Sequence, residues 1–413
     1  MNRLSLFIFA FTIYILLDYY IFQAVKVVFS ASSTSVKSIV YGLYWSLTVF
    51  SILAIVAFIK TGPTYPSLRT VLGTLLIMNL MGKIFAGLFL FADDIIRVSK
   101  YAFIGLFQNG IKDTTTGSGL SRSDFLAKSA LIAGTIPMAT MSFGILSGAY
   151  DYRVRKKTIV LKNLPSAFDG MRIAQLSDIH SGSFYNKTAV QGGVDMLINE
   201  KPDLFLFTGD LVNNESKEVG EYLDTFSKIK APIGNFSVLG NHDYGDYKSW
   251  TSPQEKKKNL QDLIESHKSM GWDILLNEHR YIEVGGERLA IIGVENWGAK
   301  GFTKYGNLDL ATQNVEADTK ILLSHDPSHW DAQIRPQHSD IDLTLAGHTH
   351  GFQFGVEIGN FRWSPSQYMY KQWADLYTEG DQHLYVNRGF GFLGYPGRIG
   401  ILPEITILEL KKA

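Results

Sequence analysis

The stretch LTLAGHTHG at positions 343–351 places a short, mainly apolar run directly before two histidines spaced two residues apart. Other short apolar runs lead into polar residues in the same manner. These are Ile173–Leu176 before Ser177-Asp178-Ile179-His180, Leu204–Phe207 before Thr208-Gly209-Asp210, Phe236–Leu239 before Gly240-Asn241-His242-Asp243, and Ile321–Leu323 before Ser324-His325-Asp326. From about Tyr150 onward such runs alternate with polar helical stretches, which indicates an α/β domain over residues 151–413. We expect the polar residues to meet at one edge, because loops converge at the carboxyl ends of strands in open α/β sheets.

The residues directly after these runs have the side chains that bind divalent metal ions. Asp178 and His180 are two residues apart, so in extended chain they face the same way and can hold one ion, and His348 and His350 repeat this spacing. The predicted nitrogen and oxygen ligands are Asp178, His180, Asp210, Asn241, His325, His348 and His350. This set is larger than a closed zinc site needs, and it suits two ions that share a carboxylate. The chain has no cysteine, which excludes thiolate ligands, thiol nucleophiles and disulfides.

Taken one at a time, these residues also fit purely structural roles. Asp210 could be a turn residue or a helix cap, and His325 could be a hydrogen-bonded loop histidine. The repetition of the pattern after several runs favours metal ligation. The remaining histidines match no motif, and we expect them to be structural: His267, His279, His329, His338 and His383.

Residues 1–150 have a different composition and contain no glutamate, and all ten histidines follow residue 179. Long apolar stretches occupy 4–25, 39–59, 71–92 and 129–149, with Asp18 and Lys83 as their charged residues. Each has the roughly 20 apolar residues that a helix needs to cross a bilayer. We therefore predict a bundle of four transmembrane helices. Buried helices of a soluble bundle are the alternative, but these rarely run so long without charge. The first stretch is too long for a cleaved signal peptide.

Asp18 and Lys83 lie near the middle of the first and third predicted spans, which run in the same direction. At the helical rise their depths differ by only about 3 Å. We predict an ion pair between these helices, because a lone charge in the bilayer is costly. A proton or ion relay is the alternative interpretation, and it needs more than two such groups.

Charge gives limited information about orientation and partners. An even number of spans places both termini on one side, and basic residues near the membrane are only slightly more numerous on that side than on the other. This difference is too small for the positive-inside rule to decide the topology, although it leans toward a cytoplasmic C-terminal domain. Lys plus Arg equals Asp plus Glu at 39 each, so the chain lacks the basic surplus of a nucleic-acid-binding protein. We expect the bilayer, and no nucleic acid, among its partners.

The order Asp-x-His, Gly-Asp, Gly-Asn-His-Asp, Ser-His and Gly-His-x-His resembles the calcineurin-like metallophosphoesterases over roughly Met171 to Leu410. The sequence most resembles the membrane-anchored bacterial branch, in which some members are exported by a twin-arginine signal. The resemblance implies a four-layer α/β/β/α sandwich behind the membrane helices, in a bacterial inner (cytoplasmic) membrane. Ser121-Arg122-Ser123-Asp124-Phe125-Leu126 is similar to a twin-arginine signal that has lost its second arginine. We therefore expect the fourth span to be a plain anchor.

The resemblance also implies roles for the motif residues. One ion would take Asp178, His180 and His350, a second ion would take Asn241, His325 and His348, and Asp210 would bridge both. His242 would contact the phosphate and assist the departing oxygen, oriented by Asp243. Nitrogen and oxygen ligands of this kind accept manganese, iron or zinc more readily than magnesium.

Residues around the predicted site raise further expectations. Phe352 stands where the relatives usually have a second glycine, so its ring should narrow the substrate entrance without disturbing the metals. An aromatic-rich segment comes next, with Phe361, Trp363, Tyr368, Tyr370, Trp373 and Tyr377. It could form a rim that faces lipid or an acyl-bearing substrate, or it could be a packed excursion over a sheet edge. Arg388 lies in a glycine-rich loop and is a candidate ligand of the substrate phosphate, although it could equally pair with a carboxylate.

The resemblance predicts a membrane-anchored, dinuclear-metal enzyme that hydrolyses a phosphodiester or pyrophosphate bond. Four spans exceed what a tether requires, so we expect a membrane-associated substrate. UDP-2,3-diacylglucosamine of lipid A biosynthesis is the example that a related branch suggests, and a soluble nucleotide or a cell-wall polymer remains open. Two alternatives are a transporter or receptor with a regulatory phosphoesterase domain and an inactive metal-binding scaffold. The complete ligand set and His242 argue against the scaffold.

Overall fold

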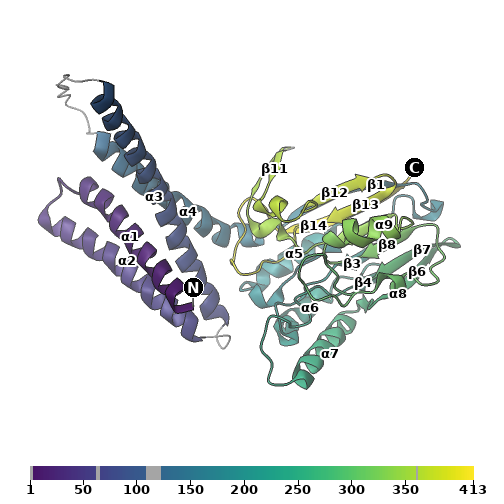
Figure 1. Cartoon of the computed structure of the whole chain (residues 1–413). Coiled ribbons are helices and arrows are strands. Elements are labelled where there is room, and N and C mark those ends of the chain that lie inside the picture. The colour runs from purple at the N-terminus through teal and green to yellow at the C-terminus, as the bar shows by residue number, and fades with distance from the viewer. Residues whose placement is uncertain (1–2, 62–65, 108–121, 360) are drawn as a thin grey trace. The chain divides into compact units, whose positions relative to one another are not determined.

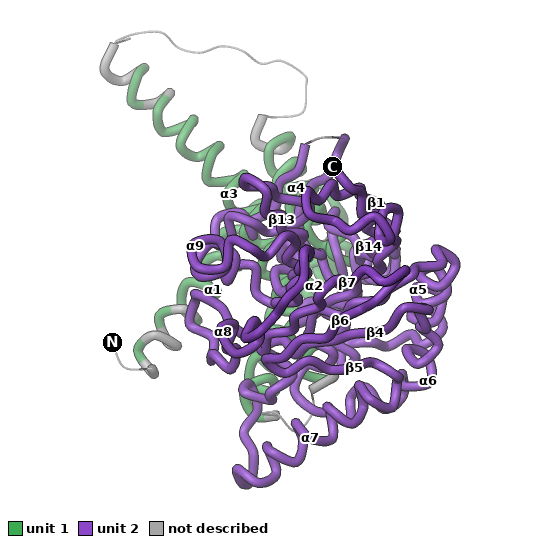
Figure 2. Tube along the Cα trace, turned by 90° about the vertical axis from the view of Figure 1, so that its right-hand side faces the viewer, with its two compact units in different colours: residues 1–143 green, residues 144–413 purple. Residues whose placement is uncertain are grey.

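The computed structural model describes residues 3–61, 66–107, 122–359 and 361–413. The chain divides into two compact units, Met1–Phe143 and Gly144–Ala413 (Figure 2). The sequence predicts the boundary at residue 150, whereas the second unit begins at Gly144 and includes the end of the last apolar stretch.

The first unit consists of long apolar helices. They are α1 (Arg3–Val28), α2 (Thr34–Thr61), α3 (Pro66–Phe107) and α4 (Arg122–Leu146). Each contains a segment long and apolar enough to cross a bilayer: Phe11–Val28, Thr34–Lys60, Leu68–Ser99 and Phe125–Tyr150. Large apolar side chains such as Leu43 and Ile59 are exposed on these helices, as expected where lipid is the solvent. The predicted membrane domain with four spans is confirmed.

Helix α3 is longer than the sequence pattern suggested. The predicted span ends at Ala92, whereas α3 continues to Phe107. Asp93 and Arg97 lie one turn apart on α3 with their charged atoms 3.6 Å from each other, which lets polar residues continue the helix. Residues 108–121, which include Ser121 of the incomplete twin-arginine motif, lie outside the described residues.

The predicted ion pair in the membrane unit is confirmed. Lys83 Nζ lies 2.6 Å from Asp18 Oδ1, and both side chains are buried. The Thr48 hydroxyl donates to Asp18 Oδ2 at 2.8 Å, the Tyr44 hydroxyl donates to the Asp18 carbonyl at 2.8 Å, and Lys83 Nζ also donates to the Tyr14 hydroxyl at 2.6 Å. Both carboxylate oxygens therefore have partners, so this cluster ties α1, α2 and α3 together as a closed network.

The second unit contains two six-stranded sheets and several helices (Figure 1). The helices are α5 (Lys187–Asn199), α6 (Leu223–Phe226), α7 (Pro253–Ser269), α8 (Leu308–Ala311) and α9 (Arg335–Gln337). The strands of the first sheet, in spatial order, are β1 (Arg153–Leu161), β14 (Glu404–Lys412), β2 (Arg172–Leu176), β3 (Leu204–Phe207), β4 (Gly234–Ser237) and β5 (Asp273–Ile274). Those of the second are β12 (Asp375–Glu379), β13 (Gln382–Val386), β9 (Leu343–Ala346), β8 (Lys320–Leu323), β7 (Glu287–Gly293) and β6 (Glu278–Val284). A separate hairpin joins β10 (Val356–Ile358) and β11 (Phe361–Trp363).

Alternation along the strands produces four layers. Leu204 and Leu206 of β3 point into the core between the sheets, whereas Phe205 and Phe207 pack on the outer face among side chains from α5, α6 and α7. Strand β7 alternates likewise, and the outer face of its sheet packs against α8 and the helical segment 330–337. Because both faces of each sheet are covered, the central strands β3, β8 and β9 are mainly apolar. The predicted α/β/β/α sandwich is confirmed.

Candidate metal centre

The predicted ligands lie directly after strands β2, β3, β4, β8 and β9, which run parallel to one another within each sheet. Five of these ligands have left-handed backbone conformations, with φ of +53° at Asp178, +48° at His180, +60° at Asp210, +71° at His348 and +50° at His350. Each such residue costs about 1–2 kcal/mol. Strain of this kind persists where the surrounding structure enforces it, commonly at functional sites. Here the left-handed conformation turns the chain sharply at the ends of the strands.

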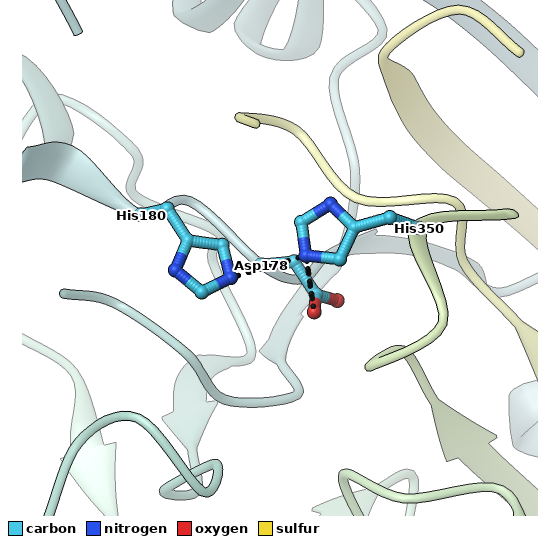
Figure 3. Close-up of side chains that lie close together, drawn as sticks. All are labelled: Asp178, His180 and His350. Atoms are coloured by element: carbon cyan, nitrogen blue, oxygen red, sulfur yellow. Dashed lines mark hydrogen bonds and ion pairs between the residues drawn. The ribbon is translucent and has the colours of Figure 1, made fainter. Parts of the chain in front are cut away.

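The first cluster contains Asp178, His180 and His350 (Figure 3). Asp178 Oδ1 lies 3.1 Å from His350 Nε2, and His180 Nε2 lies 3.1 Å from the same nitrogen. His180 Nδ1 lies 3.1 Å from Asn213 Oδ1, a contact that fixes the proton on Nδ1 and leaves the Nε2 lone pair toward the cluster. Burial lowers the pKa of His180 well below its usual value, so its ring is neutral. A neutral imidazole and a carboxylate aimed at one point form a candidate cation site.

The second cluster contains Asp210, His325 and His348. Asp210 Oδ2 lies 3.1 Å from His325 Nε2, and His325 Nδ1 lies 2.7 Å from the Thr208 carbonyl, to which it donates. Burial acts to lower the pKa of His325, but without a metal the neighbouring Asp210 carboxylate outweighs it and raises the value to about 10. Asn241 Oδ1 lies 2.8 Å from His348 Nδ1, so the seventh predicted ligand borders this cluster.

Asp210 connects the two clusters. Its Oδ2 is 3.5 Å from His180 Nε2 in the first cluster and 3.1 Å from His325 Nε2 in the second. Its Oδ1 accepts the His242 N–H at 2.9 Å. One carboxylate oxygen therefore reaches both groups, as a bridging ligand must. In His180 and His325, one ring nitrogen contacts a protein oxygen and so orients the other ring nitrogen toward its cluster. Imidazoles oriented in this way, together with buried carboxylates, fit two divalent cations.

The contacts of His242 and Asp243 agree only in part with the roles predicted from the sequence. The Nδ1 atom of His242 lies 2.8 Å from the Asn213 carbonyl, and its ring centroid is 5.0 Å from that of His180. Asp243 accepts backbone N–H groups from Asp210, Leu211, Val212 and Gly240. The prediction that Asp243 orients the His242 ring is therefore wrong, because Asn213 contacts the ring and Asp243 holds the Asp210 loop. Burial and the Asp210 charge raise the pKa of Asp243 to about 7, although these donors act to lower it.

The suggestion that Arg388 binds substrate is contradicted by its partners. Its side chain is fully buried, with Nη1 2.6 Å from Glu404 Oε2 and Nη2 2.7 Å from Glu357 Oε1. The second arginine of the glycine-rich region, Arg398, is also buried, and its Nη2 lies 3.3 Å from His350 Nδ1. Arg388 thus forms structural ion pairs with Glu357 and Glu404, and Arg398 supports the loop beside the first cluster.

The sequence gives little or no signal for several side chains that lie beside the candidate ligands. The Tyr370 hydroxyl lies 2.8 Å from His348 Nε2, and the Tyr247 hydroxyl accepts from Asn241 Nδ2 at 2.8 Å. Lys300 Nζ lies 4.7 Å from the centroid of the Tyr370 ring. The aromatic composition of 361–377 pointed toward Tyr370, whereas no motif marks Tyr247 or Lys300 in the sequence.

The aromatic-rich segment fits both of its predicted interpretations in part. Tyr370 and Trp373 are buried, as in a packed excursion, whereas Phe361 and Tyr368 are exposed, as in a rim. Phe352 is also exposed and has a φ of +52°, a conformation that favours glycine.

Comparisons with known proteins agree with this geometry. Residues 2–149 match the family model described as a probable calcineurin-like phosphoesterase transmembrane domain, and residues 171–352 match that of the calcineurin-like phosphoesterase domain. The uncharacterized metallophosphoesterase YkuE of Bacillus subtilis is 28% identical over 62% of this chain and 84% of its own length. A transmembrane protein with metallophosphoesterase domain from Danio rerio is 28% identical over 69% of this chain, and the match spans 63% of that protein. The phosphodiesterase YaeI of Escherichia coli is 29% identical over 58% of this chain and 82% of its own length.

Proposed function

This chain belongs to the calcineurin-like phosphoesterases, a family of metal-dependent phosphoester hydrolases, and from that premise we propose that it cleaves a phosphodiester or pyrophosphate bond of a lipid-linked substrate at a membrane surface. The single observation that carries the chemistry is Asp210 Oδ2, which lies within reach of both ligand clusters. When bound, two divalent ions supply a water nucleophile at neutral pH and neutralise charge on the phosphate. The imidazole-rich ligand set favours manganese, iron or zinc over magnesium.

Residues of the chain would donate the proton, position the bridging carboxylate and bind the phosphate. His242 Nδ1–H donates to the Asn213 carbonyl, so the doubly protonated ring can give the proton on Nε2 to the departing oxygen. Asp243 fixes the backbone at Asp210 through four N–H groups, so the bridging carboxylate is held in position. Lys300 and Tyr370 border the second cluster, where a cationic and a hydroxyl group suit the non-bridging oxygens of a phosphate.

The membrane unit supports a lipid-linked substrate. A single span suffices to tether a soluble enzyme, whereas this chain has four. UDP-2,3-diacylglucosamine of lipid A biosynthesis is the specific substrate to test first, and a soluble nucleotide and a cell-wall polymer are the competitors. We propose a bacterial inner (cytoplasmic) membrane as the location, and the basic residues lean only slightly toward a cytoplasmic second unit.

A substrate screen tests the proposal. The purified full chain with Mn²⁺ is assayed against bis-para-nitrophenyl phosphate, para-nitrophenyl phosphate and the lipid pyrophosphate, beside Asn241→Ala and His242→Ala. Gln191→Ala, on the surface of α5, is the matched control. We expect both site variants to lose activity and the control to keep it. Activity that survives in both site variants would mean that the reaction occurs elsewhere.

A further inference from the structure

The β10–β11 hairpin has one apolar face and one charged face. Its register pairs Val356 with Trp363, Glu357 with Arg362 and Ile358 with Phe361. Because side chains alternate across a strand, the charged pair lies on the opposite face from the two apolar pairs. The apolar face carries Val356, Ile358, Phe361 and Trp363.

The charged face of this hairpin is the one that points to the body of the domain. Glu357 Oε1 accepts from Arg388 Nη2 at 2.7 Å, and Arg362 Nη1 lies 3.2 Å from Asp375 Oδ2. Ile358 and Phe361 are 73% and 61% exposed. Figure 1 shows β11 standing away from the two large sheets. This arrangement reverses that of a half-buried sheet in water, in which the polar face is solvated, so the exposed face requires an apolar partner.

The exposed apolar surface extends from the hairpin to the metal centre. It also includes Phe352, Phe354, Tyr368 and Met369, all exposed, and we call these four residues and the hairpin face together the apolar patch. The Ser364 hydroxyl, directly after β11, donates to the Gly351 carbonyl at 2.6 Å. Gly351 is next to the predicted ligand His350, so the patch borders the first cluster.

The patch is also linked to the point where the chain leaves the fourth span. The end of that span, from Gly144 to Tyr150, belongs to the second unit. Arg398 N donates to the Gly144 carbonyl at 3.1 Å, and the next residue, Ile399, accepts from Gly355 N at 2.9 Å. Gly355 directly precedes β10. One short loop therefore separates the membrane exit from the hairpin, which makes the bilayer the apolar phase nearest to the patch.

We propose that the apolar patch docks into the lipid bilayer, so that the phosphate of an amphiphilic substrate reaches the metal centre while its acyl chains stay in the membrane. The route of substrate entry rests on the proposed function, whereas the docking itself does not. Tyr368 and Trp363 suit such a position, because their rings and polar tips are both satisfied at the membrane interface.

Spin-label accessibility tests the docking directly. The chain has no cysteine, so Ile358→Cys provides a single labelling site on the full chain in vesicles of phosphatidylethanolamine and phosphatidylglycerol. We expect the label to collide more often with oxygen than with a water-soluble nickel complex. Leu310→Cys, exposed on α8, is the control and should show the opposite preference. A label at Ile358 that prefers the nickel complex overturns the proposal, as does dipolar broadening that shows two copies of the chain meeting at this face.

An activity test separates docking from function. Ile358→Ser combined with Phe361→Ser should lower turnover of a lipid-linked pyrophosphate in the same vesicles by about tenfold, because two membrane anchors are lost. Turnover of bis-para-nitrophenyl phosphate should stay within twofold, and Leu310→Ser should affect neither reaction. Parallel loss of both activities contradicts the entry route. If the unmodified chain hydrolyses none of these esters, the proposed function fails, and the spin-label result still decides whether the patch docks.

Discussion

The membrane unit and the sandwich each bury a cluster of charged and polar side chains, but the two clusters are completed differently. In the membrane unit, the Asp18 carboxylate contacts the Lys83 ammonium and accepts from the Thr48 hydroxyl, so both of its oxygens have partners within the protein. In the sandwich, His180 Nε2 faces His350 Nε2 at 3.1 Å, and Asp210 Oδ2 lies 3.1 Å from His325 Nε2 and 3.5 Å from His180 Nε2. The ion pair of the membrane unit thus serves packing, whereas the converging ligand atoms of the sandwich fit a cation.

Of the changes considered, removing the carboxylate of Asp210, which reaches both clusters, should have the largest effect on activity. Asp210→Asn should lower turnover of bis-para-nitrophenyl phosphate by about 10⁴-fold, because both ions lose their shared carboxylate. Steady-state assays of the full chain in detergent with excess Mn²⁺ provide the measurement. Asp224→Asn, an exposed carboxylate paired with Lys187, is the matched control and should retain activity. Equal activity in both variants would show that Asp210 does not bridge ions.

Removing the proposed acid should separate chemistry from metal binding. His242→Gln should lower turnover by about 10³-fold, the usual contribution of a general acid. The metal content measured by mass spectrometry should equal that of the unmodified chain, since His242 lies outside both ligand clusters. Loss of metal in this variant would instead assign His242 as a ligand.

Breaking the membrane cluster should change stability and leave chemistry intact. Lys83→Met leaves the buried Asp18 carboxylate without its cation and should cost about 3 kcal/mol. Combining it with Asp18→Leu should recover much of that loss, since no unpaired charge then remains. Thermal unfolding in lipid nanodiscs measures the stability, and turnover of the soluble ester provides the comparison. A severe loss of turnover in a folded double variant would favour a functional role for the pair.

A buried histidine outside the metal centre should give the smallest effect, visible in the pH dependence of stability. Burial lowers the pKa of His267 to about 3, from an ordinary value of about 6.5. The unfolded chain binds the proton more readily, so this stability is present above pH 6.5 and is lost as the pH falls. We expect a loss of about 1 kcal/mol between pH 7 and pH 5.5. Thermal unfolding of His267→Gln should lack this part of the loss, whereas His279→Gln should retain it.

Local patterns in the sequence were sufficient to predict the layers, the four spans, the Asp18–Lys83 pair and the clustering of the candidate ligands. Each of these depends on periodicity or on the residue types directly after a strand. The roles of Asp243 and Arg388 were not predictable in this way, because they depend on the backbone of a distant loop and on Glu404 and Glu357. The alternation in the β10–β11 hairpin is visible in the sequence, but only the partners of Glu357 reveal which face is outside.

Two cations that share the Asp210 carboxylate should be detectable by electron paramagnetic resonance of the Mn²⁺-loaded full chain. We expect two manganese ions per chain with an exchange-coupled spectrum, and loss of the coupling in Asp210→Asn. A single ion per chain, or two ions that give only the six-line pattern of isolated Mn²⁺, would contradict this arrangement.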